Sequence, residues 1–435
     1  MNTNNLTQIF IFLGVLLAIV KPLGWFMSRV FQGEPCGFDR LFGPVERGMY
    51  RLSGVEPKNE MSCKSYSIAA ILFNFVSFAF VYLVLRLQGS LPLNPQAFTA
   101  NTPDSAFNTA VSFATNTNWQ GYGGETTMSY LSQMLALTLQ NFVSAASGIA
   151  VLIAVIRGFA RRNSETIGNF WVDLTRSTVY VLLPLSIVLA LFLVSQGVLQ
   201  NFKPYQTVTL LQPTSIEEPV LDADGKPSVD AEGKPITKKK EITEQLLPMG
   251  PVASQVAIKQ LGANGGGYFN VNSAHPYENP TPLANFIEVL SILVIAAALC
   301  WTFGDMVGDR RQGWAVLVAM MVIFVPLVFG VVAAEQAGNP RLMSLGSNSD
   351  GNQTNVDQIA SSRLRDADAF LDVQRGGCRN WNTGHGNGSR SASCLSNSDD
   401  DRRIVVRDWY CRHGSYDSSE RHRNFGSSRR SCRRR

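Results

Sequence analysis

Histidine is scarce in this 435-residue sequence, and its cysteines follow no recognisable pattern. There are four histidines, and His275 is the only one before residue 385. The seven cysteines lack the spacing of metal ligands, and four of them lie in the last 60 residues. We therefore expect neither a histidine metal cluster nor a disulfide framework. No activated nucleophile and no pair of carboxylates stands out either, so we do not expect this chain itself to be catalytic.

Long apolar runs, in contrast, are abundant. Runs of about 20 residues, the length needed to cross a hydrocarbon core of roughly 30 Å, recur along the first 334 residues. Several are apolar on every face, unlike the amphipathic helices of a soluble protein. The sequence therefore predicts an all-α polytopic protein embedded in a lipid bilayer. The predicted spans are 9–28, 66–87, 128–156, 177–196, 283–304 and 314–334.

The distribution of Lys and Arg predicts the orientation. Residues 89–127 contain neither. Residues 29–65 are rich in Lys and Arg, and residues 157–176 are rich in Arg. Basic residues concentrate in cytoplasmic loops, which places the N-terminus outside. The first run has no Lys or Arg before Lys21 and no small-residue cleavage pattern, so we interpret it as a retained helix rather than a removed signal.

Two stretches share one plan, in which a membrane helix is followed by a short semi-apolar run, a glycine-rich strip and another membrane helix. We interpret this as an internal repeat with re-entrant segments at "SAFNTAVSF" and "ASQVAIKQ". The predicted organisation is a first helix in 1–28, a cytoplasmic loop in 29–65, a repeat in 66–156, a second loop in 157–176, a repeat in 177–304, and a helix in 314–334 that opens a third repeat.

Two further segments differ from the membrane body. The polar insert 203–248 has paired Asp-Gly and Glu-Gly turns and is expected to be an external, hairpin-containing loop, more simply a solvated appendage than a binding element. The tail 343–435 is rich in Arg and Ser, and residues 341–435 contain 17 Arg and no Lys. It is expected to be aberrant or disordered.

The glycine-rich strips carry the chemistry. A dehydrated potassium ion needs oxygens in place of its water, and backbone carbonyls supply them where the chain can turn several toward one axis. Glycine permits the necessary dihedral angles, and "GANGGG" at 262–267 has four glycines. Neutral amides at Asn116, Asn118, Gln120 and Asn264 can brace such loops by hydrogen bonds. The strips are therefore candidate selectivity-filter segments, although glycine-rich stretches are more often plain loops.

Other interpretations of single residues stay open. Trp119 and Tyr268 fit either an interfacial aromatic belt or packing around a filter. Glu288 is ionisable within a predicted span, which makes it a possible supporting residue, but a pairing with a pore-loop amide is equally compatible. A phosphate cradle is excluded, because neither GxxxxGK[ST] nor GxGxxG spacing occurs after a strand.

Three stretches carry a family resemblance: "PVERGMYRLSGVEPKNEMSCKSYSIAAILFNF", "TNTNWQGYGGE" and "LGANGGGYFNVNSAHPYENPTPLANFIEVLSI". The chain resembles, over roughly residues 5–342, the potassium-binding, channel-like subunits of bacterial Kdp potassium-transporting ATPases. The resemblance implies helix–pore-loop–helix repeats and potassium captured from the periplasm as the transported ion. It implies filter residues Thr115, Asn116, Thr117, Asn118, Trp119 and Gln120 in the first strip, and Gly262, Ala263, Asn264, Gly265, Gly266 and Gly267 in the second.

The resemblance also implies partners and a location. These are a P-type ATPase catalytic subunit that hydrolyses ATP, small accessory membrane subunits and the bacterial inner membrane; neither a nucleic acid nor a resident cofactor is expected. Cys63 replaces the usual aromatic and Ala263 the common Thr of the family. Residues after 342 show none of the family's further repeats, which favours a frameshifted tail. Two alternatives to potassium transport are a non-conducting scaffold subunit and an inactive product.

Overall fold

A computed structural model describes residues 3–161, 164–219 and 237–337. The tail 343–435 and the turns of the insert lie outside these residues. Within the described chain, six helices are long and apolar enough to cross a membrane, which confirms the predicted spans and makes this a multi-pass membrane protein. Five of them are several residues longer than predicted, and Ser132–Ala160 has the predicted length but begins four residues later. The spans are Asn5–Gln32, Cys63–Ser90, Ser132–Ala160, Phe170–Ser195, Pro282–Val307 and Arg310–Ala337.

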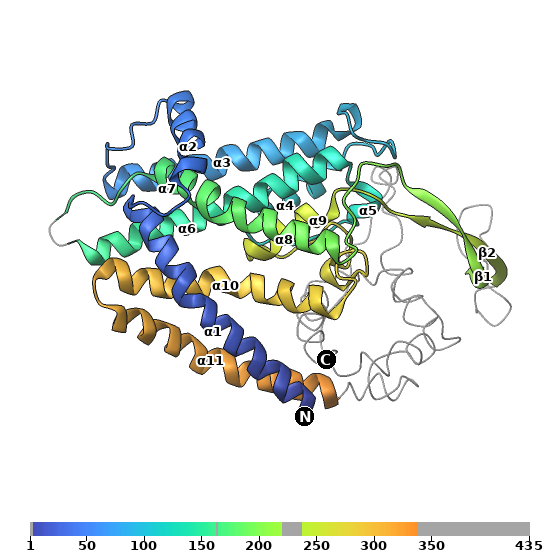
Figure 1. The fold of residues 1–435 in the computed structure, drawn as a ribbon. Coiled ribbons are helices and arrows are strands. Elements are labelled where there is room, and N and C mark those ends of the chain that lie inside the picture. The colour runs from blue at the N-terminus through green and yellow to red at the C-terminus, as the bar shows by residue number, and fades with distance from the viewer. Residues whose placement is uncertain (1–2, 162–163, 220–236, 338–435) are drawn as a thin grey trace, which may run out of the picture.

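Helices and one β-hairpin make up the described chain (Figure 1). The long or membrane-spanning helical pieces are α1 (Thr3–Gln32), α3 (Cys63–Leu87), α6 (Leu139–Ala160), α7 (Phe170–Arg176), α8 (Leu183–Ser195), α10 (Pro282–Val307) and α11 (Arg310–Ala337). The shorter elements are α2 (Asp39–Ser53), α4 (Pro103–Ala114), α5 (Gly124–Thr127), α9 (Val252–Leu261), and the 3-10 turns η1 (Gln88–Ser90) and η4 (Asn272–Ala274). The strands are β1 (Gln206–Pro219) and β2 (Thr237–Leu247).

The hairpin qualifies the all-α expectation. Strands β1 and β2 pair antiparallel, with Gln206 opposite Leu247 and a register shift between Thr209 and Thr214. They project from one end of the long helices, whereas α2 lies at the other end (Figure 1). The insert therefore contains the expected hairpin, set apart from the helical body.

Two membrane spans contain a π-helical segment. Segment η2 (Ser132–Thr138) leads into α6, and η3 (Ser177–Leu182) joins α7 to α8. Such segments hold one more residue per turn than an α-helix and turn side chains that a regular helix would aim elsewhere. In η2 this brings Gln133 to the second repeat, where its Nε2 donates to the Tyr268 carbonyl at 3.0 Å.

Close backbone contact holds α1 against α10. A Cβ atom at Gly24 would lie 2.6 Å from the Ala298 carbonyl oxygen, so only glycine allows this approach. The Thr302 hydroxyl donates to the Gly24 carbonyl at 3.0 Å. The second repeat is thereby packed against the first helix of the chain, and the core between them positions the segment after α9.

Candidate functional site: two paired glycine-rich strips

Each candidate strip follows directly on a short helix. Helix α4 starts at Pro103 behind a Thr102 cap, whose hydroxyl accepts from the Ser105 amide at 3.4 Å, and ends at Ala114. Helix α9 runs from Val252 to Leu261. Both are too short to span a membrane, as expected for re-entrant segments. Their C-terminal ends, which carry the negative pole of the helix dipole, meet the beginnings of the strips.

Left-handed residues recur along both strips. Asn116 and Asn118 have φ of 59° and 53°, and in the second strip Ala263, Gly265 and Gly266 have φ of 49°, 79° and 67°. Alternation of right- and left-handed residues turns successive amide N–H groups to one side and the carbonyls to the other. Asn tolerates this conformation better than most residues, whereas Ala263 adopts it at a steric cost. The two strips therefore share left-handed residues at two alternate positions, and the second strip adds a third at Gly266.

Ser112 of α4 accepts hydrogen bonds from backbone amides of the first strip. Its carbonyl accepts from the amides of Thr117 and Asn118, at 2.9 and 3.1 Å. Its hydroxyl accepts from the Trp119 amide at 2.5 Å. Three consecutive N–H groups thus face the helix. In the second strip, the Lys259 carbonyl of α9 accepts from the Asn264 amide at 3.1 Å in the corresponding place.

Amide side chains of the first strip bond across to carbonyls of the second. Asn116 Nδ2 donates to the Gly262 carbonyl at 3.4 Å, and Asn118 Nδ2 to the Gly265 carbonyl at 3.3 Å. Gln120 Nε2 donates to the Gly267 carbonyl at 3.1 Å. Every second residue of the first strip therefore contacts the second strip, and these amides brace the loops as the sequence suggested.

The remaining predicted residues lie in the same place. Asn264 Nδ2 donates to the Asn116 side-chain oxygen and to Ser144 Oγ of α6. Thr115, Thr117, Ala263 and Gly265 are exposed, which puts alternate positions of each strip at the surface of the described chain. A Cβ at Gly266 would lie 3.2 Å from that of Asn118. The structure thus brings both predicted strips together.

The aromatic residues pack onto the strips. The Trp119 ring covers Gly121, where a Cβ would lie 2.7 Å from a ring carbon. Tyr268 is buried, and its hydroxyl donates to the Met249 carbonyl at 3.2 Å. These contacts describe packing around the strips rather than an aromatic belt at a membrane surface.

Glu288 lies behind the second strip, fully buried on α10. Its Oε2 accepts from Gln260 Nε2 of α9 at 2.7 Å, and the same amide donates to Ser273 Oγ at 2.8 Å. Of the two interpretations offered above, the structure favours the pairing with a pore-loop amide. Glu288 supports α9 from behind and does not line either strip.

A buried ion pair lies beside Glu288 and was not identified from the sequence. Lys259 Nζ of α9 pairs with Glu278 Oε2, and these residues are 1% and 0% exposed. Glu278 Oε1 also accepts from the Phe269 amide at 2.8 Å, just beyond the second strip. Unpaired burial of either charge is costly, so the pair fixes the segment after the strip to α9. The sequence feature that could have indicated this ion pair is the lysine within the semi-apolar run "ASQVAIKQ".

Glu125 ties together the ends of the two strips. Its Oε2 accepts from the Asn270 amide at 2.8 Å, and burial raises the pKa of this carboxyl above its ordinary value. The adjacent Gly124 allows close contact, because a Cβ there would lie 1.9 Å from the Tyr268 carbonyl oxygen. The glycine-rich segment 121–124 therefore brings the chain that follows the first strip into contact with the chain that follows the second.

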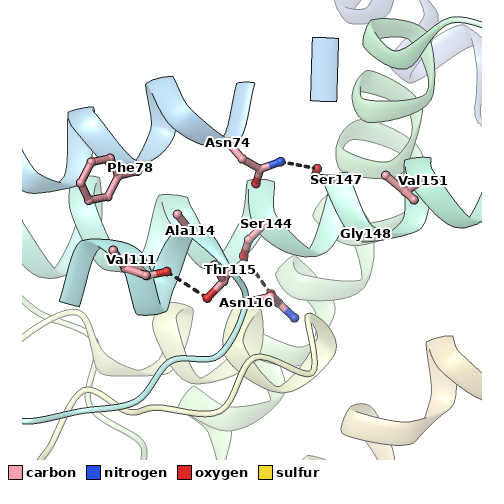
Figure 2. Close-up of a pocket in the computed structure, with 10 residues that line it drawn as sticks. All are labelled: Asn74, Phe78, Val111, Ala114, Thr115, Asn116, Ser144, Ser147, Gly148 and Val151. Carbon is pink, nitrogen blue, oxygen red and sulfur yellow. Dashed lines mark hydrogen bonds between the residues drawn. The ribbon is translucent and has the colours of Figure 1, made fainter. Parts of the chain in front are cut away.

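A cavity of about 520 Å³ opens beside the start of the first strip (Figure 2). Thr115 and Asn116 line it together with α3, α4 and α6. Ser144 Oγ donates to Asn116 Oδ1 at 2.8 Å, and Asn74 Nδ2 donates to Ser147 Oγ at 3.2 Å. The lining of this space between membrane helices is mostly apolar, with Phe78, Val111 and Val151, and the amide and hydroxyl groups are the polar points within it.

Comparison with known proteins gives a consistent result. The sequence profile of the family described as Potassium-transporting ATPase A subunit matches residues 10–364. A "Potassium-transporting ATPase potassium-binding subunit" of Methylococcus capsulatus is 57% identical over 83% of this chain and 62% of its own length. The protein of the same name from Chromobacterium violaceum is 58% identical over 80% of this chain and 58% of its own. The chain spans about three fifths of the length of these relatives.

Proposed function

The chain belongs to the Potassium-transporting ATPase A subunit family, and from that premise we propose that it binds potassium ions and passes them along its two strips. The observation that carries the proposal is the shared design of the strips. Both have left-handed residues at two alternate positions, Asn116 and Asn118 in the first and Ala263 and Gly265 in the second, and the second has one more at Gly266. Two loops of this kind, each following a short helix, are what we expect of paired ion-coordinating segments.

The proposed selectivity is that of backbone carbonyls. Potassium loses its hydration shell if protein oxygens replace it at comparable energy. The strip amides are held by α4 and α9, so the carbonyls on the opposite side are oriented before an ion arrives. The C-terminal ends of α4 and α9 add a negative potential that favours a cation. The filter residues of this proposal are Thr115, Asn116, Thr117, Asn118, Trp119, Gln120, Gly262, Ala263, Asn264, Gly265, Gly266 and Gly267.

We further propose that the chain works within an ATP-driven uptake complex in the bacterial inner membrane. The names of its relatives refer to a subunit of a potassium-transporting ATPase. We assign ATP hydrolysis to a P-type catalytic partner accompanied by small accessory membrane subunits. Potassium is the transported ion in this scheme.

The proposed orientation has the N-terminus and both strips facing outward. Ser90 and Ser164 are both exposed. Ser90 ends the span Cys63–Ser90, and Ser164 lies one membrane crossing later, in the loop after the span Ser132–Ala160. In a variant without native cysteines, Ser90→Cys is expected to react with an impermeant maleimide applied to intact spheroplasts, whereas Ser164→Cys is expected to react only after lysis. The reverse result would invert the orientation.

Ion-dependent stability tests potassium binding directly. The full chain is purified in detergent and its unfolding temperature is measured in potassium, sodium and choline chloride at equal ionic strength. A ligand at 100 times its Kd stabilises the folded state by about 2.7 kcal/mol, which raises the unfolding temperature. We expect this increase in potassium and not in sodium. Gly265→Asp is the matched variant expected to lose it.

The same measurement, together with a test of whether the chain co-purifies with the ATPase subunit when both are expressed, separates the other candidate functions. A scaffold subunit that does not conduct would co-purify with the ATPase subunit but unfold at the same temperature in all three salts. An inactive product would show neither potassium-dependent stability nor co-purification. Both outcomes would exclude ion binding by the strips of this chain.

A further inference from the structure

Helix α2 has an apolar face that is largely uncovered in the described chain. Side chains three or four residues apart share one side of a helix. Leu41 and Leu52 are 65% and 90% exposed. They belong to an apolar stripe that begins at the residue preceding the helix and includes Phe38, Leu41, Val45, Met49 and Leu52, all exposed.

A second face of α2 fixes the helix to the membrane body. Glu46 Oε1 accepts from Arg176 Nε at 3.0 Å and from the Tyr50 hydroxyl at 2.7 Å. Glu46 Oε2 accepts from the Tyr180 hydroxyl at 2.8 Å. Both Arg176 and Tyr180 belong to the span Phe170–Ser195. The helix is therefore held at a set rotation and its apolar stripe has a fixed direction.

The third face of α2 is basic. Arg40, Arg47 and Arg51 recur at helical spacing on the side opposite the apolar stripe, and all three are exposed. Within the described residues, none of the three forms an ion pair. An apolar face opposite a row of arginines is the pattern of helices that lie in the interface of a membrane.

Contacts at the margin of the stripe place α2 at membrane depth. The Phe38 ring meets Phe26 edge to face, with centroids 5.8 Å apart, and Phe42 meets Tyr180 at 5.7 Å. Phe26 and Tyr180 both lie inside membrane spans rather than in the loops beyond them. Helix α2 runs crosswise to the long helices at their end, as a helix in the membrane plane would (Figure 1).

A second aromatic contact marks the same level. Trp25, next to Phe26 on α1, is exposed, and the Arg29 guanidinium lies 4.9 Å from its ring centroid. Tryptophan and arginine are typical of the boundary between headgroups and acyl chains. The apolar stripe is therefore continuous with the surface that α1 presents to lipid.

We propose that α2 is an interfacial lipid-binding helix: its apolar stripe inserts among acyl chains, and Arg40, Arg47 and Arg51 bind the phosphates of anionic phospholipids. The proposal requires only that the chain is a membrane protein and does not depend on potassium binding. A lipid fits better than a protein partner, because the stripe continues a lipid-facing surface and because the arginines have no acidic partner in the described chain.

Photocrosslinking at Leu52 tests the occupant of the stripe. Leu52→p-benzoylphenylalanine is made in the full chain, because the Leu52 side chain is exposed and its replacement disturbs no packing. The protein is placed in nanodiscs that contain equal amounts of phosphatidylglycerol and phosphatidylcholine. Irradiation is expected to add the mass of one phospholipid. Lys58→p-benzoylphenylalanine, at an exposed loop position beyond the end of α2, is the control and should give several-fold less lipid adduct.

The headgroup of the adduct tests the arginines. We expect phosphatidylglycerol to exceed phosphatidylcholine in the Leu52 adduct by at least about threefold, and R40Q, R47Q and R51Q combined to return the ratio to one. A ratio of one in the unchanged arginine background would overturn the headgroup assignment. An adduct to another protein or a second copy, or a Leu52 adduct no stronger than the Lys58 control, would overturn the interfacial placement.

Discussion

Lys259 and Glu278 form an ion pair sealed within the protein, between the helix that precedes the second strip and the segment that follows it. Through its other oxygen, Glu278 also accepts from the Phe269 amide. One carboxylate therefore joins both sides of the loop that holds the proposed filter residues 262–267. The pair makes the shape of the second strip depend on residues that do not line it.

Lys259→Met is expected to destabilise the chain strongly. It keeps most of the side-chain volume but leaves Glu278 buried without its cation, and breaking such a pair costs about 3–5 kcal/mol. The unfolding temperature in detergent measures the loss. Lys259→Met combined with Glu278→Gln should be more stable than Lys259→Met alone, because the neutral amide still accepts from Phe269. Equal stability of the single variant and the unchanged protein would contradict this account.

Alanine at Gly265 and alanine at Gly267 are expected to affect different properties, potassium binding in the first case and folding stability in the second. At Gly265 a Cβ meets nothing within 4 Å, so the cost is only that of φ at +79°, about 1–2 kcal/mol. At Gly267 a Cβ would lie 2.5 Å from the Asn272 Cα, so the backbone itself must move. Gly265→Ala should preserve folding and weaken potassium-dependent stabilisation. Gly267→Ala should lower the unfolding temperature in every salt.

Gln120→Ala tests the bracing between strips. It removes one neutral hydrogen bond to the Gly267 carbonyl, which contributes about 0.5–1.5 kcal/mol, or at most about tenfold in potassium affinity. Asn118→Ala should cost more, since the Asn118 amide also donates to Asn141 Oδ1. Potassium titrations followed by thermal unfolding compare the two. A larger loss from Gln120→Ala would contradict the ranking.

His275 is expected to make stability fall in acid. Burial lowers its pKa below the ordinary value, and its Nδ1 accepts from the Tyr277 amide at 3.1 Å, which requires the neutral ring. The unfolded chain therefore binds a proton more readily. This contribution is fully present above about pH 6.5 and decreases as the pH falls below that value.

The measurement is the unfolding temperature between pH 7.5 and pH 5.5. His275→Phe keeps the stacking on Phe269, where the rings lie 4.0 Å apart and nearly parallel. This variant should be less stable at neutral pH, because the Tyr277 amide loses its acceptor, but should show a shallower decline toward pH 5.5. A decline as steep as that of the unchanged chain would assign the acid sensitivity to other groups.

Much of the fold was accessible from the sequence because lipid is a demanding solvent. A span must be apolar for about 20 residues, and that constraint is visible without knowledge of any contact. The re-entrant helices followed from length, since "SAFNTAVSF" and "ASQVAIKQ" are too short to cross. The strips followed from their glycines and from their position after these helices.

The supporting residues were not accessible in the same way. Ser112 holds three amides, and nothing about an isolated serine in a semi-apolar run indicates this. Glu278 lies 19 residues after Lys259, a separation without helical or strand periodicity. Gln133 reaches Tyr268 from a segment that is locally π-helical. Such pairings depend on tertiary packing, which periodicity does not encode.

The π-helical segment Ser132–Thr138 also affects how this span tolerates change in length. Loss of one residue from a regular α-helix turns everything beyond it by about 100°, so lipid-facing and buried sides exchange. Loss of one residue inside a π-helical segment converts it to a regular α-helix and leaves the later turns facing as before. Single-residue deletions should therefore be accommodated at this point of the span and rejected within Leu139–Ala160. Alignments that allow a gap here will keep the faces of the helix in register.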